Sequence, residues 1–299
     1  MVILLGSTGY IGGKFAEALN TKNIQFEGLS RSFLDYTDKA TLKQYLQEKK
    51  PAYLINAAGY TGKPNVDACE LNKAEALLGN AVFPGIIREV CEELDIPWGH
   101  VSSGCIYNRQ SEHTDKAFKE ADAPNFSFRT NYCSFYSGTK ALGEEILEGA
   151  SKCYIWRLRI PFNHEDSPRN YLKKVVSYSR LLEATNSLSH AEEYVHACLA
   201  CFEKQLPYGV YNVTNPGFVK TSTVVNLMLE EGKKREAEGR KNPFPKSFDF
   251  FDSEEEFMEI AAKTPRSNCC LNTEKLQKAG IHMTPIEEAL KASIAQMEF

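Results

Sequence analysis

The chain has 299 residues, of which 42% are hydrophobic and 25% are charged, and its formal net charge is -4. This composition is ordinary for a globular protein and gives no sign of a surface that binds nucleic acid. No apolar run reaches the roughly 18 residues that indicate a transmembrane helix, so we expect no membrane segment.

The first half of the chain alternates short apolar runs with helical patterns, as βαβ units on a parallel sheet do. The first run, MVILL, lacks the basic flank of a signal peptide and leads directly into a glycine loop. The predicted strands are Val2–Leu5, Gln25–Leu29, Tyr53–Asn56, Trp98–Ser102 and Tyr154–Arg159. The predicted helices between them are Ile11–Asn20, Asp38–Lys49, Lys73–Leu94 and Phe135–Glu148. This pattern predicts an α/β fold with a Rossmann-type, doubly wound parallel sheet.

The pattern changes beyond Pro161, where the stretch FNHEDSPRN is rich in asparagine, proline and charge. We expect residues 1–160 to form the Rossmann domain, and residues 161–299 to form mainly a smaller substrate-binding lobe with some segments returning to that domain. Acidic and basic residues interleave over 229–241, which favours a solvated helix face over a basic binding patch.

Three glycines in the run LLGSTGYIGGKF, namely Gly6, Gly9 and Gly12, directly follow the first strand and open a helix. A loop of this kind lets backbone N–H groups and the helix N-terminus approach a pyrophosphate, which any Cβ would obstruct. The alternative is that the glycines serve only a tight turn. The candidate cofactor residues in this loop are Gly6, Thr8, Gly9, Tyr10, Ile11 and Gly12.

The second strand ends Gly28-Leu29-Ser30-Arg31, where a site selective for NAD usually has an acid for the ribose 2′-hydroxyl. A hydroxyl at Ser30 and a guanidinium at Arg31 suit a 2′-phosphate instead, so we expect NADPH. The alternative for Arg31 is an exposed loop residue without a ligand. At the end of the third strand, the small residues after Asn56, Ala57 and Ala58, allow a cofactor to approach closely.

The motif Tyr-x-x-x-Lys occurs three times, beginning at Tyr10, Tyr45 and Tyr136. Only Tyr136 begins a helix after the fourth strand, where it can face a serine from that strand, either Ser102 or Ser103. Lys140 is one helical turn away, so its ammonium is expected to lower the pKa of the Tyr136 phenol. This set predicts ketone reduction, with Tyr136 as proton donor, Lys140 also binding the nicotinamide ribose, and a serine polarising the carbonyl. The alternative is a surface tyrosine and lysine.

Several motifs in one order resemble a branch of the extended short-chain dehydrogenases. They are GSTGYIGG from Gly6, NAAGYTGKPNVDACE from Asn56, SGCIY from Ser103, FYSGTK from Phe135, SPRNYLKK from Ser167, YNVTNPG from Tyr211 and TPRSN from Thr264. The chain is similar over nearly its whole length to plant and viral nucleotide-rhamnose synthase/epimerase-reductases. It resembles dTDP-4-dehydrorhamnose reductases and GDP-fucose synthases more distantly.

This resemblance implies a bifunctional 3,5-epimerase/4-keto-reductase that converts UDP-4-keto-6-deoxy-D-glucose to UDP-β-L-rhamnose. It favours Ser103 over Ser102 as the catalytic hydroxyl, and it implies that Cys105 and Lys174 act in epimerisation. Cys105 lies two residues after Ser103, so an extended segment would project both side chains to one face. The alternative for Cys105 is an ordinary buried cysteine, and Lys173 adjoins Lys174 so closely that only register separates them.

The resemblance also implies a substrate site. Arg266 matches an arginine that binds substrate phosphate in the family, and its guanidinium suits that chemistry. The other candidate substrate residues are Lys63, Asn65, Asp67, Ser103 and Asn170. Where plant relatives have GRPNVDWCE this chain has GKPNVDACE, so Lys63 and Ala68 replace an arginine and a tryptophan and substrate contacts there are expected to differ.

The nine cysteines are odd in number and irregularly spaced, which favours reduced thiols in a cytoplasmic protein. Cys198 and Cys201 form a C-x-x-C pair near His196, but a structural zinc site takes four ligands and no second pair has matching spacing. We therefore expect no metal. The sequence leaves open a reductase without epimerase activity, a non-catalytic regulatory subunit that binds the cofactor, the preference for UDP over dTDP, and a homodimer.

Overall fold

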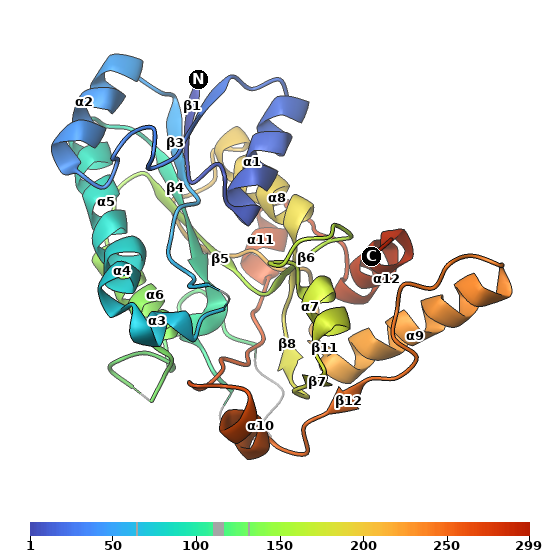
Figure 1. The fold of residues 1–299 in the computed structure, drawn as a ribbon. Coiled ribbons are helices and arrows are strands. Elements are labelled where there is room, and N and C mark those ends of the chain that lie inside the picture. The colour runs from blue at the N-terminus through green and yellow to red at the C-terminus, as the bar shows by residue number, and fades with distance from the viewer. Residues whose placement is uncertain (64, 110–116, 131) are drawn as a thin grey trace.

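A six-stranded parallel sheet forms the centre of the computed structural model, which describes residues 1–63, 65–109, 117–130 and 132–299 (Figure 1). Its strand order is β10-β5-β4-β3-β1-β2. The strands are β1 (Val2–Leu5), β2 (Phe26–Leu29), β3 (Tyr53–Asn56), β4 (Trp98–Ser103), β5 (Cys153–Leu158) and β10 (Gly209–Asn212). The predicted Rossmann-type fold is confirmed. The predicted strands match β1 to β5, whereas β10 was not predicted.

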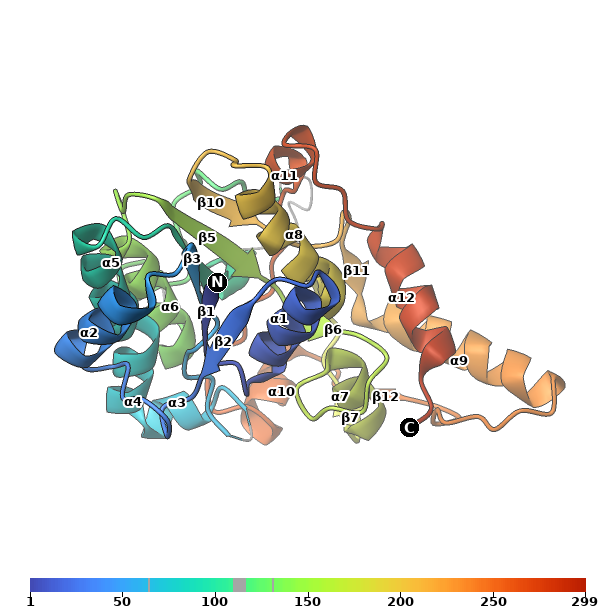
Figure 2. The same ribbon diagram turned by 90° about the horizontal axis from the view of Figure 1, so that it is seen from above.

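Helices cover both faces of the sheet (Figure 2). On one face lie α1 (Tyr10–Thr21) and α8 (Ala191–Glu203), and on the other lie α2 (Lys39–Lys49), α5 (Phe83–Glu93) and α6 (Phe135–Ile146). Strand β1 shows why its sequence is apolar throughout, because Val2 and Leu4 pack under the first pair of helices while Ile3 and Leu5 pack under the second group. The apolar runs therefore follow from burial on both faces.

The predicted helix Lys73–Leu94 is interrupted. It consists of α4 (Lys73–Leu77), a π-helical turn η1 (Leu78–Val82) and α5, preceded by the short α3 (Ala68–Leu71). The turn contains Asn80, which is fully buried and bonded to a loop twenty residues earlier in the chain. A π-helical turn widens a helix locally, and such turns often occur at functional sites.

Apart from α8 and β10, which belong to the sheet and its helix layer, most of the second half of the chain lies beside the carboxyl ends of the strands and is called the lobe here. Its helices are α7 (Tyr171–Ser177), α9 (Thr221–Ala237), α10 (Glu254–Ile260) and α12 (Ile286–Gln296), while α11 (Glu274–Lys278) packs near β10. Short strands pair in the lobe: β6 (Pro161–Phe162) with β9 (Ser189–His190), β7 (Arg180–Leu181) with β12 (Asp249–Phe250), and β8 (Thr185–Asn186) with β11 (Val219–Lys220).

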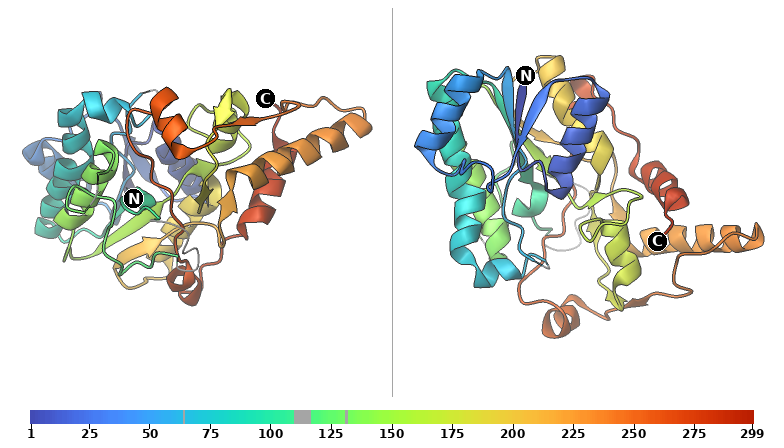
Figure 3. Two further views of the ribbon diagram at one scale, coloured as in Figure 1. Left: turned by 90° about the horizontal axis from the view of Figure 1, so that it is seen from below. Right: turned by 45° about the horizontal axis from the view of Figure 1, so that its top comes forward.

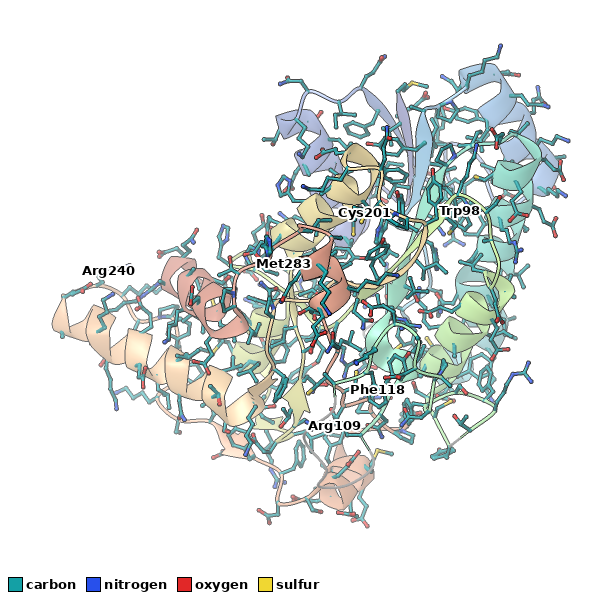
Figure 4. All side chains as sticks on the ribbon, turned by 180° about the vertical axis from the view of Figure 1, so that it is seen from behind. Trp98, Arg109, Phe118, Cys201, Arg240 and Met283 are labelled. Carbon is teal, nitrogen blue, oxygen red and sulfur yellow. The ribbon has the colours of Figure 1, made fainter. Side chains whose placement is uncertain are left out.

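Helix α9 projects away from the sheet, with α12 packed beside it (Figure 3). Figure 4 shows Arg240 just beyond the far end of α9, whereas Cys201 and Trp98 lie within the body of the protein. The lobe has its own apolar core, which includes Phe162, Leu172, Val224, Met228 and Leu290. None of the helices in the described parts of the chain is long and apolar enough to cross a membrane.

Candidate active site

A pocket at the carboxyl ends of β1 to β3 gathers most of the predicted cofactor residues. Those that line it are Gly6, Thr8, Gly9, Ser30, Arg31, Ala57 and Ala58. Residues that the sequence did not single out complete its walls, namely Tyr36, Thr37, Gly59, Tyr60, Glu75, Leu78, Gly79 and Phe83. The pocket lies where ligands of open α/β sheets bind.

The glycine loop is packed too tightly for side chains. Gly6 has a φ of 76°, and a Cβ there would lie 2.7 Å from the backbone nitrogen of Ala58. A Cβ on Gly12 would lie 1.9 Å from the Gly6 carbonyl oxygen. Helix α1 begins after Gly9 without a side-chain cap, so its first N–H groups remain available to a phosphate.

The end of β2 carries an unengaged cation. Arg31 is exposed, and it makes no ion pair or hydrogen bond with the described residues, whereas the hydroxyls of Ser30 and Ser32 lie 2.8 Å apart. The pocket lining contains no acid from the end of β2. This arrangement fits a phosphate on the ribose better than a free hydroxyl.

Three predicted cofactor residues do not line the pocket and instead form contacts within the protein next to it. The Tyr10 hydroxyl donates to Asn163 Oδ1 at 2.9 Å, and Ile11 packs against the core under α1 and α8. Asn56 is fully buried, where its Oδ1 accepts from the Ala58 N–H at 3.1 Å and its Nδ2 lies 3.0 Å from His100 Nδ1. Burial and the nearby Lys140 keep the pKa of His100 well below its usual range, so a neutral ring accepts this bond.

Ser103, Tyr136 and Lys140 come together beside this pocket. Ser103 ends β4, Tyr136 lies in the first turn of α6, and the Lys140 ammonium donates to the Val101 carbonyl at 3.2 Å. Lys140 Nζ also lies within 3.6 Å of where a Cβ on Gly59 would be. The three groups therefore share one corner, at the ends of β3 and β4.

The pKa of Tyr136 is raised, in contrast to the predicted lowering. Burial raises it, and a hydrogen bond with Ser103 and the charge of Arg159 lower it by less. Burial also shifts the pKa of Lys140, in this case downward. The Lys140 ammonium is bonded to a β4 carbonyl instead of to the phenol. A protonated phenol is the form that can give up a proton.

The two serines of β4 have different surroundings. Ser102 is buried and donates to Glu144 Oε1 at 2.5 Å, and the same carboxylate forms an ion pair with Arg157 at 2.7 Å. The Ser103 hydroxyl instead bonds Tyr136 and accepts from the Cys105 N–H at 3.2 Å. Ser103 is therefore the serine on the tyrosine side of the strand.

Cys105 follows Ser103 in the short helix η2 (Gly104–Ile106) and is 5% exposed. Burial raises the pKa of its thiol, while a hydrogen bond with Ser103 and the charges of Arg159 and Lys140 lower it. The structure thus brings Cys105 to the same corner as Tyr136, Ser103 and Lys140.

The adjacent lysines of α7 differ clearly. Lys173 forms an ion pair with Asp166 at 2.8 Å and lies over the Phe299 ring. Lys174 is half-buried and makes no ion pair with the described residues. Burial lowers its pKa, and the neighbouring Arg169 and Arg266 lower it further.

Arg266 is held by a carboxylate on the opposite side of the lobe boundary. Its two terminal nitrogens bind Asp67 Oδ1 at 2.6 Å and Oδ2 at 2.8 Å. Asn65 Oδ1 accepts from the Asp67 N–H at 2.9 Å, and Lys63 is exposed nearby in sequence. The predicted phosphate-binding guanidinium therefore already has an anionic partner.

The Asn170 side chain, a predicted substrate contact, forms its hydrogen bonds within the protein. It is fully buried and caps α7, because its Oδ1 accepts from the Leu172 N–H at 3.1 Å. Its Nδ2 donates to the carbonyls of Asn163 and Glu165, each at 2.8 Å. Backbone groups thus occupy this amide, and a contact between Asn170 and the substrate stays a prediction.

Cys198 and Cys201 are fully buried in the core under α1 and α8, whereas His196 on the same helix is exposed. Among the residues that the structure describes, no three His, Cys, Asp or Glu side chains gather as metal ligands would.

No motif or spacing in the sequence indicates a role for Asn80, which links the pocket to α6. Its Oδ1 accepts from the Tyr60 N–H at 2.9 Å, and its Nδ2 donates to the Tyr60 carbonyl at 2.8 Å and to Thr139 Oγ1 at 3.2 Å. A Cβ on Gly143 would lie 2.1 Å from the Asn80 carbonyl oxygen, so α6 packs directly on this turn. Asn80 therefore holds the pocket wall against the helix that carries Tyr136.

The parallel sheet, the glycine loop and the grouped serine, tyrosine and lysine define the class of protein, a Rossmann-type α/β protein of the short-chain dehydrogenase type. Residues 1–299 match the model of the RmlD substrate binding domain family, and the chain belongs to that family. The resemblance expected from the motifs is thereby confirmed.

Two Arabidopsis thaliana proteins illustrate the relationship. The bifunctional dTDP-4-dehydrorhamnose 3,5-epimerase/dTDP-4-dehydrorhamnose reductase is 30% identical over 295 residues, covering 96% of this chain and 90% of the relative. The trifunctional UDP-glucose 4,6-dehydratase/UDP-4-keto-6-deoxy-D-glucose 3,5-epimerase/UDP-4-keto-L-rhamnose-reductase RHM1 is 30% identical over 293 residues. The match covers 96% of this chain but only 40% of that larger relative.

Solved structures share the fold. The L780 UDP-rhamnose synthase from Acanthamoeba polyphaga mimivirus superposes with a TM-score of 0.86 at 24% identity, over 99% of both chains. A dTDP-4-dehydrorhamnose reductase from Bacillus anthracis in complex with NADP superposes with a TM-score of 0.74 at 19% identity, over 99% of this chain and 98% of that one. At these identities the likeness concerns the fold.

Proposed function

We propose that the chain is an NADPH-dependent 4-keto-reductase of nucleotide-linked sugars that also epimerises carbons 3 and 5. It would convert UDP-4-keto-6-deoxy-D-glucose to UDP-β-L-rhamnose. The observation that carries this proposal is the meeting of Ser103, Tyr136 and Lys140 beside the glycine-lined pocket. Membership of the RmlD substrate binding domain family and the activities named for the Arabidopsis relatives support it.

The pocket fits NADPH. Gly6, Gly9 and the start of α1 leave room and N–H groups for the pyrophosphate. Arg31, which has no ion-pair partner in the part of the chain that the structure describes, suits the 2′-phosphate. Ala57 and Ala58 keep the end of β3 small, and Lys140 would bind the nicotinamide ribose. When bound, NADPH supplies the hydride for the ketone carbon.

The chain's own groups handle the ketone oxygen. Ser103 Oγ would donate a hydrogen bond that polarises the carbonyl at carbon 4. The Tyr136 phenol would give its proton to the same oxygen as the alcohol forms. Burial raises the pKa of Tyr136, which keeps the phenol protonated near neutral pH before it donates.

Epimerisation uses the same ketone. The carbonyl at carbon 4 acidifies the C–H bonds at carbons 3 and 5, so the Cys105 thiolate could remove one proton and leave an enolate on O4. Ser103 and Tyr136 would stabilise that oxyanion. Lys174 would return a proton to carbon from the opposite face, and its lowered pKa makes that donation easier.

The substrate diphosphate would bind Arg266, with Lys63, Asn65 and Asp67 contributing to the adjacent sugar pocket. Because Asp67 already holds the Arg266 fork, the phosphate would share or replace this carboxylate. The Arg266 pairing supports a role for Asp67 in setting the direction of the guanidinium.

A reductase that receives an already epimerised sugar is the second candidate function. The observation in its favour is the buried thiol of Cys105, whose raised pKa disfavours the thiolate that proton removal requires.

The deciding experiment supplies UDP-4-keto-6-deoxy-D-glucose and NADPH in heavy water. We expect oxidation of NADPH and deuterium at carbons 3 and 5 of a rhamnose-configured product, detected by NMR and mass spectrometry. A reduced product without deuterium at these carbons would support the reductase alone. Binding of NADPH without its oxidation by any UDP- or dTDP-linked keto sugar would instead support a regulatory subunit.

A further inference from the structure

Arg159 is a buried arginine that forms no ion pair with any acidic residue in the described parts of the chain. The residue follows directly after β5 in the chain and is 6% exposed. Its Nη2 donates to Asn186 Oδ1 at 2.5 Å and to the Ser267 carbonyl, both of which are neutral acceptors. Its Nε is buried and has no hydrogen-bond partner among the described residues. A buried cation is costly unless it is compensated, so this position needs an explanation.

Arg157, two residues earlier on β5, shows the usual solution. It is also buried, and it forms a bidentate ion pair with Glu144 of α6, with the shortest contact at 2.7 Å. Arg159 follows directly after the end of β5, two residues beyond Arg157. Helix α6 carries Glu144, Lys140 and Tyr136 at successive turns. Arg157 thus pairs with the carboxylate of this helix, and the charge of Arg159 acts on Tyr136 at its start.

The same contacts bring Arg159 to Cys105. Leu158, the neighbour of Arg159, pairs with Ser103 in the β4–β5 ladder. Asn186 Oδ1, which holds the guanidinium, also accepts from the Cys269 N–H at 2.9 Å, and Cys269 Sγ donates to the Gly104 carbonyl at 3.2 Å. The turn that carries Cys105 and the guanidinium are thus fixed to one another.

We propose that Arg159 is a positioning residue whose guanidinium provides the counter-charge for the anionic form of the Cys105 thiol. Its catalytic meaning rests on the proposed epimerase function, in which that anion is the base. The positive charge of Arg159 then has an anionic partner in the working enzyme, which explains why its hydrogen bonds in the structure go only to the neutral acceptors Asn186 and Ser267 among the described residues.

The other groups that surround Cys105 are neutral or have another role, so Arg159 is the cation that can balance the charge of the Cys105 thiolate. They are the hydroxyls of Ser103 and Ser137, the Tyr136 phenol, the Lys140 ammonium, and the thiols of Cys69 and Cys133. Burial raises the pKa of Cys69 and of Cys133 to about 11, so both thiols are neutral near pH 7. The Lys140 ammonium donates to the Val101 carbonyl. In the proposed function it binds the nicotinamide ribose. Among these neighbours, the charge of Arg159 acts with that of Lys140 to lower the pKa of Cys105.

The test measures the Cys105 thiol directly in the cofactor-free protein. The Cβ carbons of cysteine are labelled with ¹³C, the Cys105 signal is assigned from its loss in Cys105→Ala, and its shift is followed by NMR from pH 6 to 11. We expect Arg159→Gln to raise the titration midpoint by about one pH unit or more, while Arg159→Lys, which keeps the charge, raises it by less. Equal midpoints in the wild type and Arg159→Gln, equal shifts in both variants, or a wild-type Cys105 that does not titrate by pH 11 would overturn the proposal.

A second measurement separates this proposal from the proposed function. Deuterium incorporation at carbons 3 and 5 is measured against pH, and Arg159→Gln is expected to lower its rate near pH 7 about tenfold and to move the profile to higher pH. If the wild-type protein incorporates no deuterium, the epimerase function fails, and the NMR titration alone then decides whether Arg159 stabilises the thiolate. A circular dichroism spectrum of each variant verifies that it is folded.

Discussion

Replacing Arg31 tests the basis of cofactor choice. In the structure the Arg31 guanidinium stands at the rim of the pocket, exposed and without a partner among the described residues. A 2′-phosphate is the feature that distinguishes NADPH from NADH, and a guanidinium can bind it through charge-assisted hydrogen bonds. Arg31→Ala should therefore weaken NADPH binding and leave NADH binding nearly unchanged.

The size of the effect follows from the exposure of Arg31. A hydrogen bond to a charged group contributes about 1.5–3 kcal/mol, and solvent and salt screening place an exposed group at the lower end. A loss of about 1.5 kcal/mol corresponds to roughly a tenfold increase in the Kd for NADPH. Because the interaction is between exposed charges, the difference between wild type and variant should shrink as salt is added.

The assay is isothermal titration calorimetry with each nucleotide at low and high salt. Arg240→Ala is the matched control, because Arg240 lies beyond the far end of α9, distant from the pocket (Figure 4). We expect this control to bind both nucleotides as the wild type does. The reasoning is refuted if Arg31→Ala changes the affinities for NADPH and NADH by the same factor, or changes neither.

Three further changes test the site and the lobe. Tyr136→Phe should lower the rate of NADPH oxidation with the keto sugar by about 10²–10⁴-fold at an unchanged NADPH affinity, and a wild-type rate in a stopped-flow assay would contradict its role as proton donor. Lys174→Gln should suppress deuterium incorporation measured by mass spectrometry while Lys173→Gln retains it, and equal losses would remove the distinction between the two lysines. Arg235→Met should lower the free energy of unfolding in urea by about 3–5 kcal/mol, since the buried guanidinium binds Glu231 and caps the carbonyls that end α12. A loss under about 1 kcal/mol would show that other groups satisfy these carbonyls.

The sheet and the cofactor end could be predicted because their causes are local in the sequence. Strand β1 is apolar at every position since both faces are covered, and the glycines follow it at once. The Tyr136–Lys140 pair could be chosen among three because its helix follows β4. In each case the order of elements along the chain fixes the position in the fold.

The features of the site that the sequence did not predict depend on contacts between distant segments of the chain. The Asn80 side chain forms hydrogen bonds with the backbone of Tyr60, twenty residues earlier in the chain. The spacing of apolar residues does not predict a bond of this kind. Asn170 is a candidate substrate residue from the family resemblance, and no pattern in the sequence predicts that its amide caps α7 and bonds two carbonyls. The pKa of Tyr136 was predicted from the neighbouring Lys140, whereas its burial, which a helical spacing does not reveal, has the larger effect.

The bonds of Asn80 also determine which parts of the site can move. Its amide joins the Tyr60 backbone to Thr139 of α6, and separating these segments would leave a buried polar group unsatisfied, at a cost of about 1–3 kcal/mol. We therefore expect the pocket wall and the helix that carries Tyr136 to move together. On the opposite side the Arg266 guanidinium is held to the other half of the site by its ion pair with Asp67, so an anionic ligand that takes over this guanidinium would release that link.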